Sequence, residues 1–448
     1  MKKQILFFIM SLLMITACRK DDDFGGAGNL TPVAFTVQVK YDTGVGGGAA
    51  KNATVTLKNN STGETLTGVT NETGELKLNS VLPGQYNILS SIALSQEQYY
   101  QTFGIATSRE TTTFNGSQDN VTVNVNATST VIVLSNGTVG DFVIKQIYYA
   151  GSNTTTGALF RDHFFEIHNN SNEVLYADGL YIGLLEGNVN NTVTSYTQPN
   201  GQYDWSQSPG NSVGSAANTD YVYASAVIKI PGTGTQYPVQ PGASIVVAQT
   251  AINHKAPYTN NGGVSVSILD PSLTVDLSTA DFETYLGNYA IANGGSPYAY
   301  DIQNPAVTDV DISYWEGTSN KDLLLNGTSR PALIIFKDND AAFNGYPKIP
   351  NPKDLTGKKF VRIPKKIIMD GVDTTNKALT APKDLQNDID AGKAYIQNEA
   401  GEAYADYTSF SVIRKTKETI SGRKVLVDTN NSTNDFVTIK AAPKAYAP

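Results

Sequence analysis

Short runs in which apolar and polar residues alternate occupy residues 31–135 and restrict what this part of the chain can form. Examples are "AFTVQVKY", "ATVTLKN", "GELKLNSV" and "STVIVLS", and stretches rich in Gly, Asn and Ser separate them. Alternation with period 2 places the apolar side chains on one face of a strand, and the intervening residues favour tight turns. About seven such runs predict a small β-sandwich in which each sheet has one buried face.

The rest of the chain also favours strands over helices. The 448 residues include 24 tyrosines and 39 glycines, and Thr and Asn are abundant. Thr and Tyr favour strands, whereas Gly and Asn favour turns, so we predict an all-β protein. The best candidate helix covers residues 278–291, where Ser278 and Asp281 have the spacing of a capping box.

The N-terminus has the order of an export signal. Lys2 and Lys3 precede an apolar run over residues 5–15, which is shorter than the roughly 20 residues that cross a bilayer. The only cysteine of the chain follows in "ITAC", which resembles the bacterial lipobox. This resemblance implies that residues 1–17 are a lipoprotein signal peptide and that Cys18 is acylated as a membrane anchor. An ordinary signal peptide with an incidental cysteine is the alternative.

Residues 18–30 form an acidic tether in this interpretation. Lys20, Asp21, Asp22 and Asp23 follow the anchor, and they resemble the export signal that sends lipoproteins of Bacteroidetes to the cell surface. The resemblance implies a protein on the outer face of the outer membrane. The same charges would also keep a simple tether solvated.

The charge balance argues against nucleic acid as a partner. Removal of residues 1–17 takes away two lysines and no acids, and it leaves 31 basic and 41 acidic residues, a balance of −10. Nucleic-acid binding depends on clustered Lys and Arg that replace counterions. We therefore expect no nucleic-acid partner.

The first domain carries a family resemblance over about a hundred residues. The order "VTLKNNSTGETLTGVTNETGELKLNSVLPGQYNI", with turns at residues 70–74 and 83–86, resembles the carboxypeptidase regulatory-like domain. The resemblance implies a transthyretin- or Ig-like sandwich over residues 31–135. Such domains act as spacers without catalytic residues.

Three separated segments of residues 138–448 resemble a lamin-tail domain, which is also a β-sandwich. They are "FFEIHNNSNEVLYADG", "VQPGASIVVAQ" and the closing pair "SFSVIRK" and "DTNNSTNDFVTIKAAPKA". The span is about three times what such a sandwich needs, so we expect insertions near residues 186–236 and 250–405. The closing strands should pair with the strand that begins near Phe142, and Phe436 should enter the core. The whole arrangement resembles an uncharacterised family of Bacteroides-type surface lipoproteins.

Candidate residues for catalysis or metal binding are few. The three histidines are His163, His168 and His254, and the first two would lie on opposite faces of one strand. Three acid pairs have D-x-D spacing, at residues 309 and 311, 338 and 340, and 388 and 390, without a complete calcium-binding loop. The G-x-S-x-G pattern at residues 210–214 lacks the flanking strand and helix of a nucleophile elbow. We therefore assign no catalytic residue, metal site or cofactor.

Aromatic residues within the expected insertions are the candidate ligand contacts. Rigid rings among small polar residues make adaptable binding surfaces, but long insertions also need small cores of their own. The sequence leaves both roles open for Tyr203, Trp205, Tyr298, Tyr300, Tyr314 and Trp315.

Together these features predict a non-enzymatic, lipid-anchored outer-membrane protein that binds an extracellular glycan or protein ligand for nutrient uptake. The bacterial setting of the resembled family implies a TonB-dependent transporter as partner. Two alternatives stay open. One is a structural or adhesive cell-surface protein, and the other is a metal-dependent hydrolase with its acids in residues 250–405.

Overall fold

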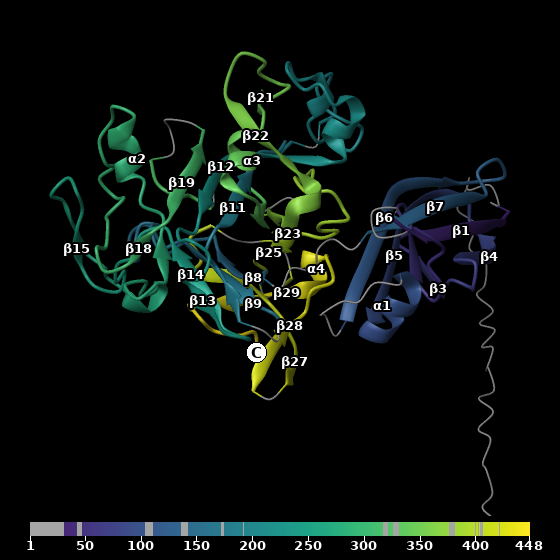
Figure 1. Ribbon diagram of the computed structural model, residues 1–448, viewed down its shortest axis with the longest axis horizontal. Coiled ribbons are helices and arrows are strands. Elements are labelled where there is room, and N and C mark those ends of the chain that lie inside the picture. Colours follow the sequence, from purple (N-terminus) through teal and green to yellow (C-terminus); the bar gives the residue numbers. More distant parts are fainter. Residues whose placement is uncertain are drawn as a thin grey trace, which may run out of the picture.

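The computed structural model is all-β and contains two groups of sheets (Figure 1). It describes residues 31–42, 47–103, 111–135, 142–171, 174–190, 192–316, 321–325, 331–375, 381–398, 400–401, 403, 406–420 and 422–448. The predicted anchor Cys18 and the export residues Lys20, Asp21, Asp22 and Asp23 lie outside the described residues. In the part that is described, no helix has the length and apolar character that a membrane crossing requires.

The first domain is a sandwich of a three-stranded and a four-stranded sheet. The strand orders are β4–β1–β7 and β3–β2–β5–β6. Side chains from both sheets share one core, which includes Val37, Leu57 and Phe114. The elements are β1 (Val33–Tyr41), β2 (Thr54–Asn59), β3 (Thr65–Val69), β4 (Glu75–Val81), β5 (Gly84–Ser95), α1 (Gln96–Phe103), β6 (Thr111–Val123) and β7 (Ser129–Leu134).

The expected turn at residues 70–74 closes the β3–β4 connection. The Thr70 hydroxyl donates to the Ala50 carbonyl at 2.5 Å and accepts from the Ala53 amide at 2.9 Å. Gly74 has φ +76, and a Cβ there would lie 2.4 Å from the Val39 carbonyl oxygen. Only glycine fits such a position without strain. The turn residues of this segment therefore have a structural role.

The second domain contains two seven-stranded sheets. The first has the order β18–β17–β14–β9–β8–β26–β29. As expected from the sequence, the C-terminal strands close this sheet, because β26 pairs with β8 on one side and with β29 on the other. Its strands are β8 (Phe142–Tyr148), β9 (Phe164–Asn169), β14 (Ser244–Ala248), β17 (Phe282–Glu283), β18 (Thr308–Asp309), β26 (Phe410–Arg414) and β29 (Phe436–Lys440).

The second seven-stranded sheet has the order β21–β22–β12–β11–β20–β23, and β19 also pairs with β12. Most of its strands come from the segments expected as insertions, so these segments build the fold as well as decorate it. The strands are β11 (Leu180–Leu185), β12 (Tyr221–Lys229), β19 (Asp311–Trp315), β20 (Leu333–Lys337), β21 (Lys348–Pro350), β22 (Lys359–Pro364) and β23 (Ile368–Val372).

Smaller elements decorate this domain. The helices among its described residues are α2 (Gly287–Ala292), α3 (Asp340–Asn344), α4 (Ser432–Asp435), η2 (Trp205–Gln207), η3 (Gly214–Asn218), η4 (Pro271–Leu273) and η5 (Lys365–Ile367). Two-stranded ladders join β10 (Leu175–Tyr176) to β13 (Pro238–Val239), β15 (Tyr258–Thr259) to β16 (Ser265–Val266), β24 (Thr374–Thr375) to β25 (Ala394–Tyr395), and β27 (Thr416–Ile420) to β28 (Arg423–Leu426).

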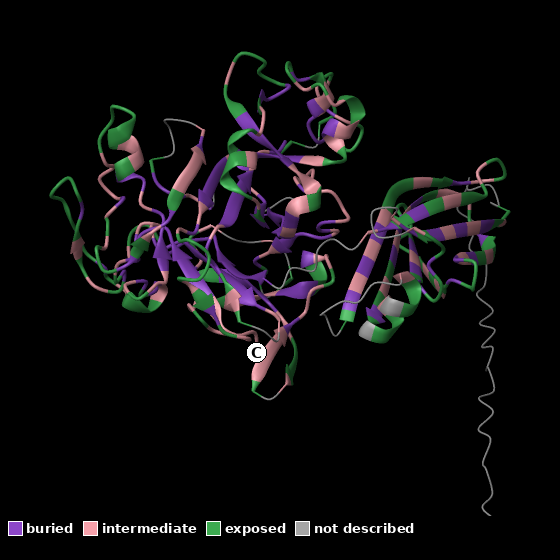
Figure 2. Cartoon of the chain, in the orientation of Figure 1, coloured by how far each residue is buried: buried purple, intermediate pink, exposed green. Residues whose placement is uncertain are grey.

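The two large sheets share a core, and the second sheet is also covered on its other face. Ile144 and Ile167 of the first sheet and Ile182 and Ile335 of the second belong to one buried cluster. A separate cluster on the far face of the second sheet includes Phe336 and residues of α3 and of residues 385–389. Strand β11 of the second sheet is consequently buried along its whole length, and so are β8 and β9 of the first sheet (Figure 2).

The predicted helix over residues 278–291 is wrong in most of its length. Strand β17 occupies residues 282–283, and only the short α2 lies within or near the predicted range. The supposed capping residues serve a turn, because Asp281 accepts from the Val246 amide and the Ser278 amide donates to Asp276. Local helix signals were overridden by pairing with β14.

Candidate functional site

A cavity of about 620 Å³ lies between the C-terminal segment and the loops around η4. Residues 440–444 form one wall, and residues 272–280 with Lys255 form the other. Val246, Val275 and Leu277 supply buried apolar lining. The volume falls within the range of roughly 300–1,000 Å³ that is typical of ligand pockets. This cavity is the candidate functional site.

The C-terminal wall rests on a buried polar layer of the first large sheet. The Gln146 side-chain amide donates to the Ala442 carbonyl at 2.9 Å, and the Lys444 amide donates to Glu166. The hydroxyl of Tyr446 donates to the Gly242 carbonyl at 2.7 Å. These contacts hold residues 442–446 in place, so the wall has a defined position.

A buried ion pair lies beneath that wall. The Lys145 ammonium is 2.8 Å from a Glu166 carboxylate oxygen, and the two side chains are 1% and 0% exposed. The ammonium also lies 4.0 Å from the centre of the Tyr446 ring. Burial lowers the pKa of Lys145, whereas the charge of Glu166 opposes that shift. Residues 442–446 therefore shield the pair from water, and their loss would expose it.

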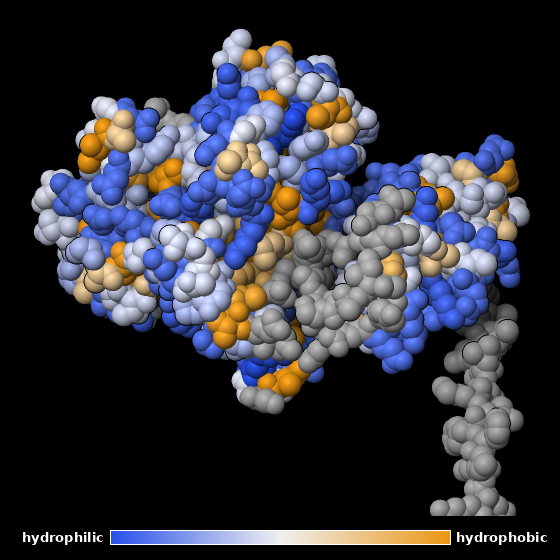
Figure 3. Space-filling model, viewed as in Figure 1, coloured by the Kyte–Doolittle hydropathy of each residue, from blue (hydrophilic) through white to orange (hydrophobic). Residues whose placement is uncertain are grey.

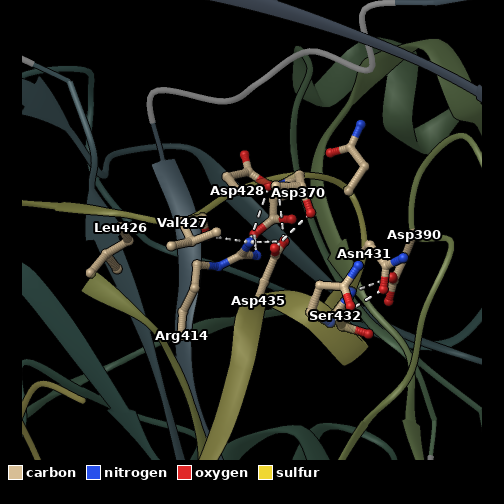
Figure 4. Close-up of polar contacts among 12 residues, drawn as sticks. Asp370, Asp390, Arg414, Leu426, Val427, Asp428, Asn431, Ser432 and Asp435 are labelled. Atoms are coloured by element: carbon tan, nitrogen blue, oxygen red, sulfur yellow. Dashed lines mark hydrogen bonds and ion pairs between the residues drawn. The ribbon is translucent and has the colours of Figure 1, made fainter. Parts of the chain in front are cut away.

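Arg414 fixes the strands that lead to the cavity. In Figure 4 its guanidinium points into three carboxylates, and it lies 2.7 Å from Asp370, 3.1 Å from Asp428 and 3.2 Å from Asp435. Asp370 belongs to β23 of the other sheet and also accepts from the Ile144 amide at 2.6 Å. One arginine thus joins both sheets to the loop before β29. The last residue of β29, Lys440, lines the cavity.

The three carboxylates outnumber the single guanidinium. Burial raises the pKa of Asp370 to about 7 even though Arg414 opposes the shift, and burial likewise raises the pKa of Asp435 to about 6. A raised carboxyl pKa means that the native state holds a proton more tightly than the unfolded chain does. The cluster therefore couples the second domain to pH.

Hydrogen bonds to the buried interior hold the opposite wall. The Thr274 hydroxyl donates to Asp162 at 2.6 Å, and the Ser409 hydroxyl donates to the Leu273 carbonyl at 2.5 Å. Because Ser409 directly precedes β26, this bond ties the η4 wall to the strand beside β29. Both walls are consequently anchored to the same sheet.

The structure buries three of the six candidate aromatic residues, Tyr203 and Trp205 in a small core and Trp315 in the core that the two large sheets share. Tyr203 is 7% exposed, Trp205 is 4% exposed and Trp315 is 8% exposed. Trp205 stacks on Tyr223 with ring centres 3.7 Å apart. Rings packed in this way have no face for a ligand, so at these positions the structure favours the alternative role that the sequence left open.

The other three candidate aromatics are half-buried and already in contact with cations. Arg161 lies 5.4 Å from the ring centre of Tyr298 and 5.5 Å from that of Tyr300. The Lys348 ammonium lies 5.3 Å from the ring centre of Tyr314, whose hydroxyl donates to the Lys359 carbonyl at 2.6 Å. Neither these three nor the buried three line the cavity.

The candidate acids and histidines are distributed over separate contacts. Asp311 and Asp340 both approach Lys229, at 3.7 and 2.9 Å, whereas Asp388 pairs with Lys365 at 2.6 Å. His163, His168 and His254 are all fully buried. Among the residues that the structure describes, no group of three or more His, Cys, Asp or Glu side chains is arranged to hold a metal ion.

Sequence reasoning missed the cavity and its lysines. Lys255, Lys440 and Lys444 line it, and only the fold brings Lys255 close to the other two. The "KAAPK" at residues 440–444 belongs to the segment that the sequence predicts to close the domain. Two lysines that bracket a short apolar stretch at a strand end were the available signal.

Comparisons with known proteins concern the fold and one family. Residues 240–443 match the family described as "Protein of unknown function (DUF4876)". A crystal structure of a DUF4876 family protein from Bacteroides thetaiotaomicron is 22% identical, with a TM-score of 0.50 over 93% of this chain and 98% of that one. A proposed cell adhesion protein from Bacteroides eggerthii is 12% identical, with a TM-score of 0.17 over 50% of this chain and 82% of that one. No curated protein matches the chain.

Proposed function

We propose that this protein is a surface-exposed outer-membrane lipoprotein that binds an extracellular ligand for nutrient uptake and is not an enzyme. The observation that carries the proposal is the cavity of about 620 Å³, whose two walls are anchored to one sheet. The face of the molecule in Figure 3 is largely hydrophilic, with hydrophobic residues in small separate areas. Such a surface favours recognition in a cavity over a broad apolar interface.

The two domains divide the work in this proposal. The first, a carboxypeptidase regulatory-like sandwich, is a spacer that lifts the second away from the membrane. The second, a lamin-tail-like sandwich enlarged by the segments near residues 186–236 and 250–405, carries the ligand site. The fold and the match of residues 240–443 to a family support this division without naming a ligand.

Thr279 gives a direct test of ligand binding, because its exposed side chain lines the cavity. Thr279→Trp should fill the cavity and abolish binding of monosaccharides and oligosaccharides in a thermal-shift screen of the full chain. Thr419→Trp is the matched control, because Thr419 is exposed on β27 and does not line the cavity. If Thr279→Trp binds every sugar that the native protein and the control bind, the cavity is not the ligand site. An adhesive or structural role then becomes the better proposal.

The proposed location on the cell surface is tested separately. Cys18→Ala should abolish acylation, and replacement of Lys20, Asp21, Asp22 and Asp23 with alanine should leave an acylated protein inside the cell. Protease added to intact cells would then digest the native protein and spare the second variant. Equal digestion of both would contradict surface export by these residues.

The transporter partner is tested in native membranes. Affinity capture of the full chain should recover a TonB-dependent transporter, and capture of Cys18→Ala should not. Recovery of no transporter with the acylated protein would remove this partner from the proposal while leaving the ligand site untouched.

A further inference from the structure

The lining of the cavity carries a local excess of positive charge on an acidic protein. Three lysines, Lys255, Lys440 and Lys444, line it together with one acid, Asp276. The whole chain has a formal charge of −8. A cavity lined by one sign of charge concentrates ligands of the opposite sign. The lining is therefore positively charged although the chain as a whole is negatively charged.

The three lysines are not equally available. The Lys444 ammonium lies 3.2 Å from Asp281 and is paired. Lys255 and Lys440 form no ion pair with any carboxylate in the described part of the chain. Asp270 lies outside the lining, and its pKa is lowered mainly by hydrogen bonds from Ser272, with a smaller contribution from the charge of Lys440. Two ammonium groups are thus left for a ligand.

The two available lysines come from opposite walls. Lys440 ends β29, and Lys255 belongs to the loop that a backbone bridge between Asn253 and Asp276 joins to the η4 wall. One oxygen of the Asp276 carboxylate accepts from the Ser278 amide at 2.9 Å and from its hydroxyl at 2.6 Å, so the carboxylate is held in its own turn, and the three lysines of the lining still outnumber its charge. A ligand between the walls would meet an ammonium group from each side.

The chemistry of the remaining lining argues against a neutral sugar. None of the described residues that line the cavity is aromatic, so no ring is present on which a sugar face could stack. Alanines, Pro443 and buried valines provide short apolar contacts, and Thr279 provides a hydroxyl. Charge-assisted hydrogen bonds are the strongest contacts that these residues can make.

We propose that the cavity recognises an anionic oxygen group, a carboxylate or a sulfate, held between Lys255 and Lys440. This inference rests on the proposed ligand-binding function and specifies its ligand class. Lys444 holds the wall that carries Lys440, because its backbone amide donates a hydrogen bond to Glu166 and its ammonium pairs with Asp281.

Titration calorimetry on the full chain tests the proposal with three probes: glucuronic acid, glucose and sodium sulfate. Glucuronic acid should bind, glucose should not, and affinity should fall as salt is added. Lys255→Gln and Lys440→Gln should each weaken binding about tenfold, the loss expected for one charge-assisted hydrogen bond. Lys417→Gln, at an exposed position on β27 outside the cavity, is the matched control and should leave affinity unchanged.

The outcomes separate the ligand class from the proposed function. If sulfate binds and competes with glucuronic acid, the site recognises negative charge in general. If glucuronic acid binds and sulfate does not, the site recognises a carboxylate. Both results support the inference. Glucose could instead bind as tightly as glucuronic acid, keep its affinity in both lysine variants and lose it in Thr279→Trp. This result would overturn the proposed anionic ligand but would leave the cavity as the ligand site. Absence of binding by both anions overturns the inference.

Discussion

Strands β1 and β8 belong to domains of the same class, yet they bury their side chains differently. In β1 the buried residues alternate with exposed or half-buried ones, whereas all seven residues of β8 are buried. A strand with one covered face needs apolar residues only at every second position, whereas a strand covered on both faces buries every side chain, including any polar or charged one that it carries. The difference decides where charges are buried.

The buried polar residues of the two domains follow this difference. In the described part of the first domain they are uncharged, namely Asn59, Thr70, Ser90 and Thr112. The second domain buries charged side chains that include Lys145, Glu166, Asp370 and Arg414. Buried charges require partners, so the second domain depends on buried ion pairs, whereas the ion pairs among the described residues of the first, Lys51–Glu72 and Lys77–Glu75, lie at the surface.

The largest expected effect comes from removing the central charge of the Arg414 cluster. Arg414→Gln leaves Asp370, Asp428 and Asp435 without their cation, and breaking a buried pair typically costs about 3–5 kcal/mol. Calorimetry of the full chain should show two unfolding transitions, of which only that of the second domain falls. Arg414→Lys keeps the charge but loses the Nε bond to the Ile144 carbonyl, and should cost less. Equal shifts of both transitions would contradict the separation of the two domains.

Phe436 should have the next largest effect. Its side chain is 6% exposed, belongs to the core between the large sheets and lies 4.8 Å from the Arg414 guanidinium. Phe436→Ala should destabilise the second domain by about 3 kcal/mol, at the lower end for buried phenylalanine. The same calorimetric measurement applies, and truncation before Asp428 should abolish the second transition altogether. A second transition that survives truncation would mean that the C-terminal strands are dispensable.

The sequence predicts those parts of the molecule in which local pattern and burial agree. The alternation of residues 31–135 and the turn at Gly74 predict the first domain, and the loop before Phe436 predicts the closing strand. Strands such as β20, "LIIFK", show no alternation of apolar and polar residues, because both of their faces are covered. The sequence pattern therefore does not distinguish them as strands within the expected insertion. The cavity lysines are separated by most of the second domain, and local patterns carry no information on such contacts.

The pH dependence of stability should differ between the domains. Burial raises the pKa of Asp370, Glu186 and Glu283 to about 7 and that of Asp301 to about 8. The unfolded chain has lost these protons by pH 6.5, so the native state binds more protons, and stability falls as pH rises through 7 and 8.

Histidines offset only a small part of this trend. Burial lowers the pKa of His168 to about 4, and it also lowers the pKa of His254, so both are neutral in the native state, whereas in the unfolded chain they are about half protonated at pH 6.5 and lose that charge by about pH 7.5. The four carboxyls together lose about 4 kcal/mol between pH 6.5 and 8.5, since one pKa unit corresponds to about 1.4 kcal/mol, and the histidines return about 1, so the second transition should lose roughly 3 kcal/mol of stability. The first transition should stay constant, because the shifted group described there, Tyr41, has a pKa of about 12. A second transition that is flat or rises over this range would contradict the raised carboxyl pKa values.

The smallest effect on stability should come from replacing one valine in a strand with a single covered face and one valine in a strand covered on both faces. Val131 on β7 is 49% exposed, whereas Val143 on β8 is fully buried. Val131→Thr places a hydroxyl in water and should change the first transition by less than about 0.5 kcal/mol. Val143→Thr buries the same hydroxyl and should cost about 1–3 kcal/mol unless it finds a hydrogen-bond partner. Urea denaturation with separate fluorescence and calorimetric readouts would measure both. A cost at Val131 equal to that at Val143 would mean that the outer face of β7 is covered in the native protein, and the contrast between one-sided and two-sided strands would then fail at this edge.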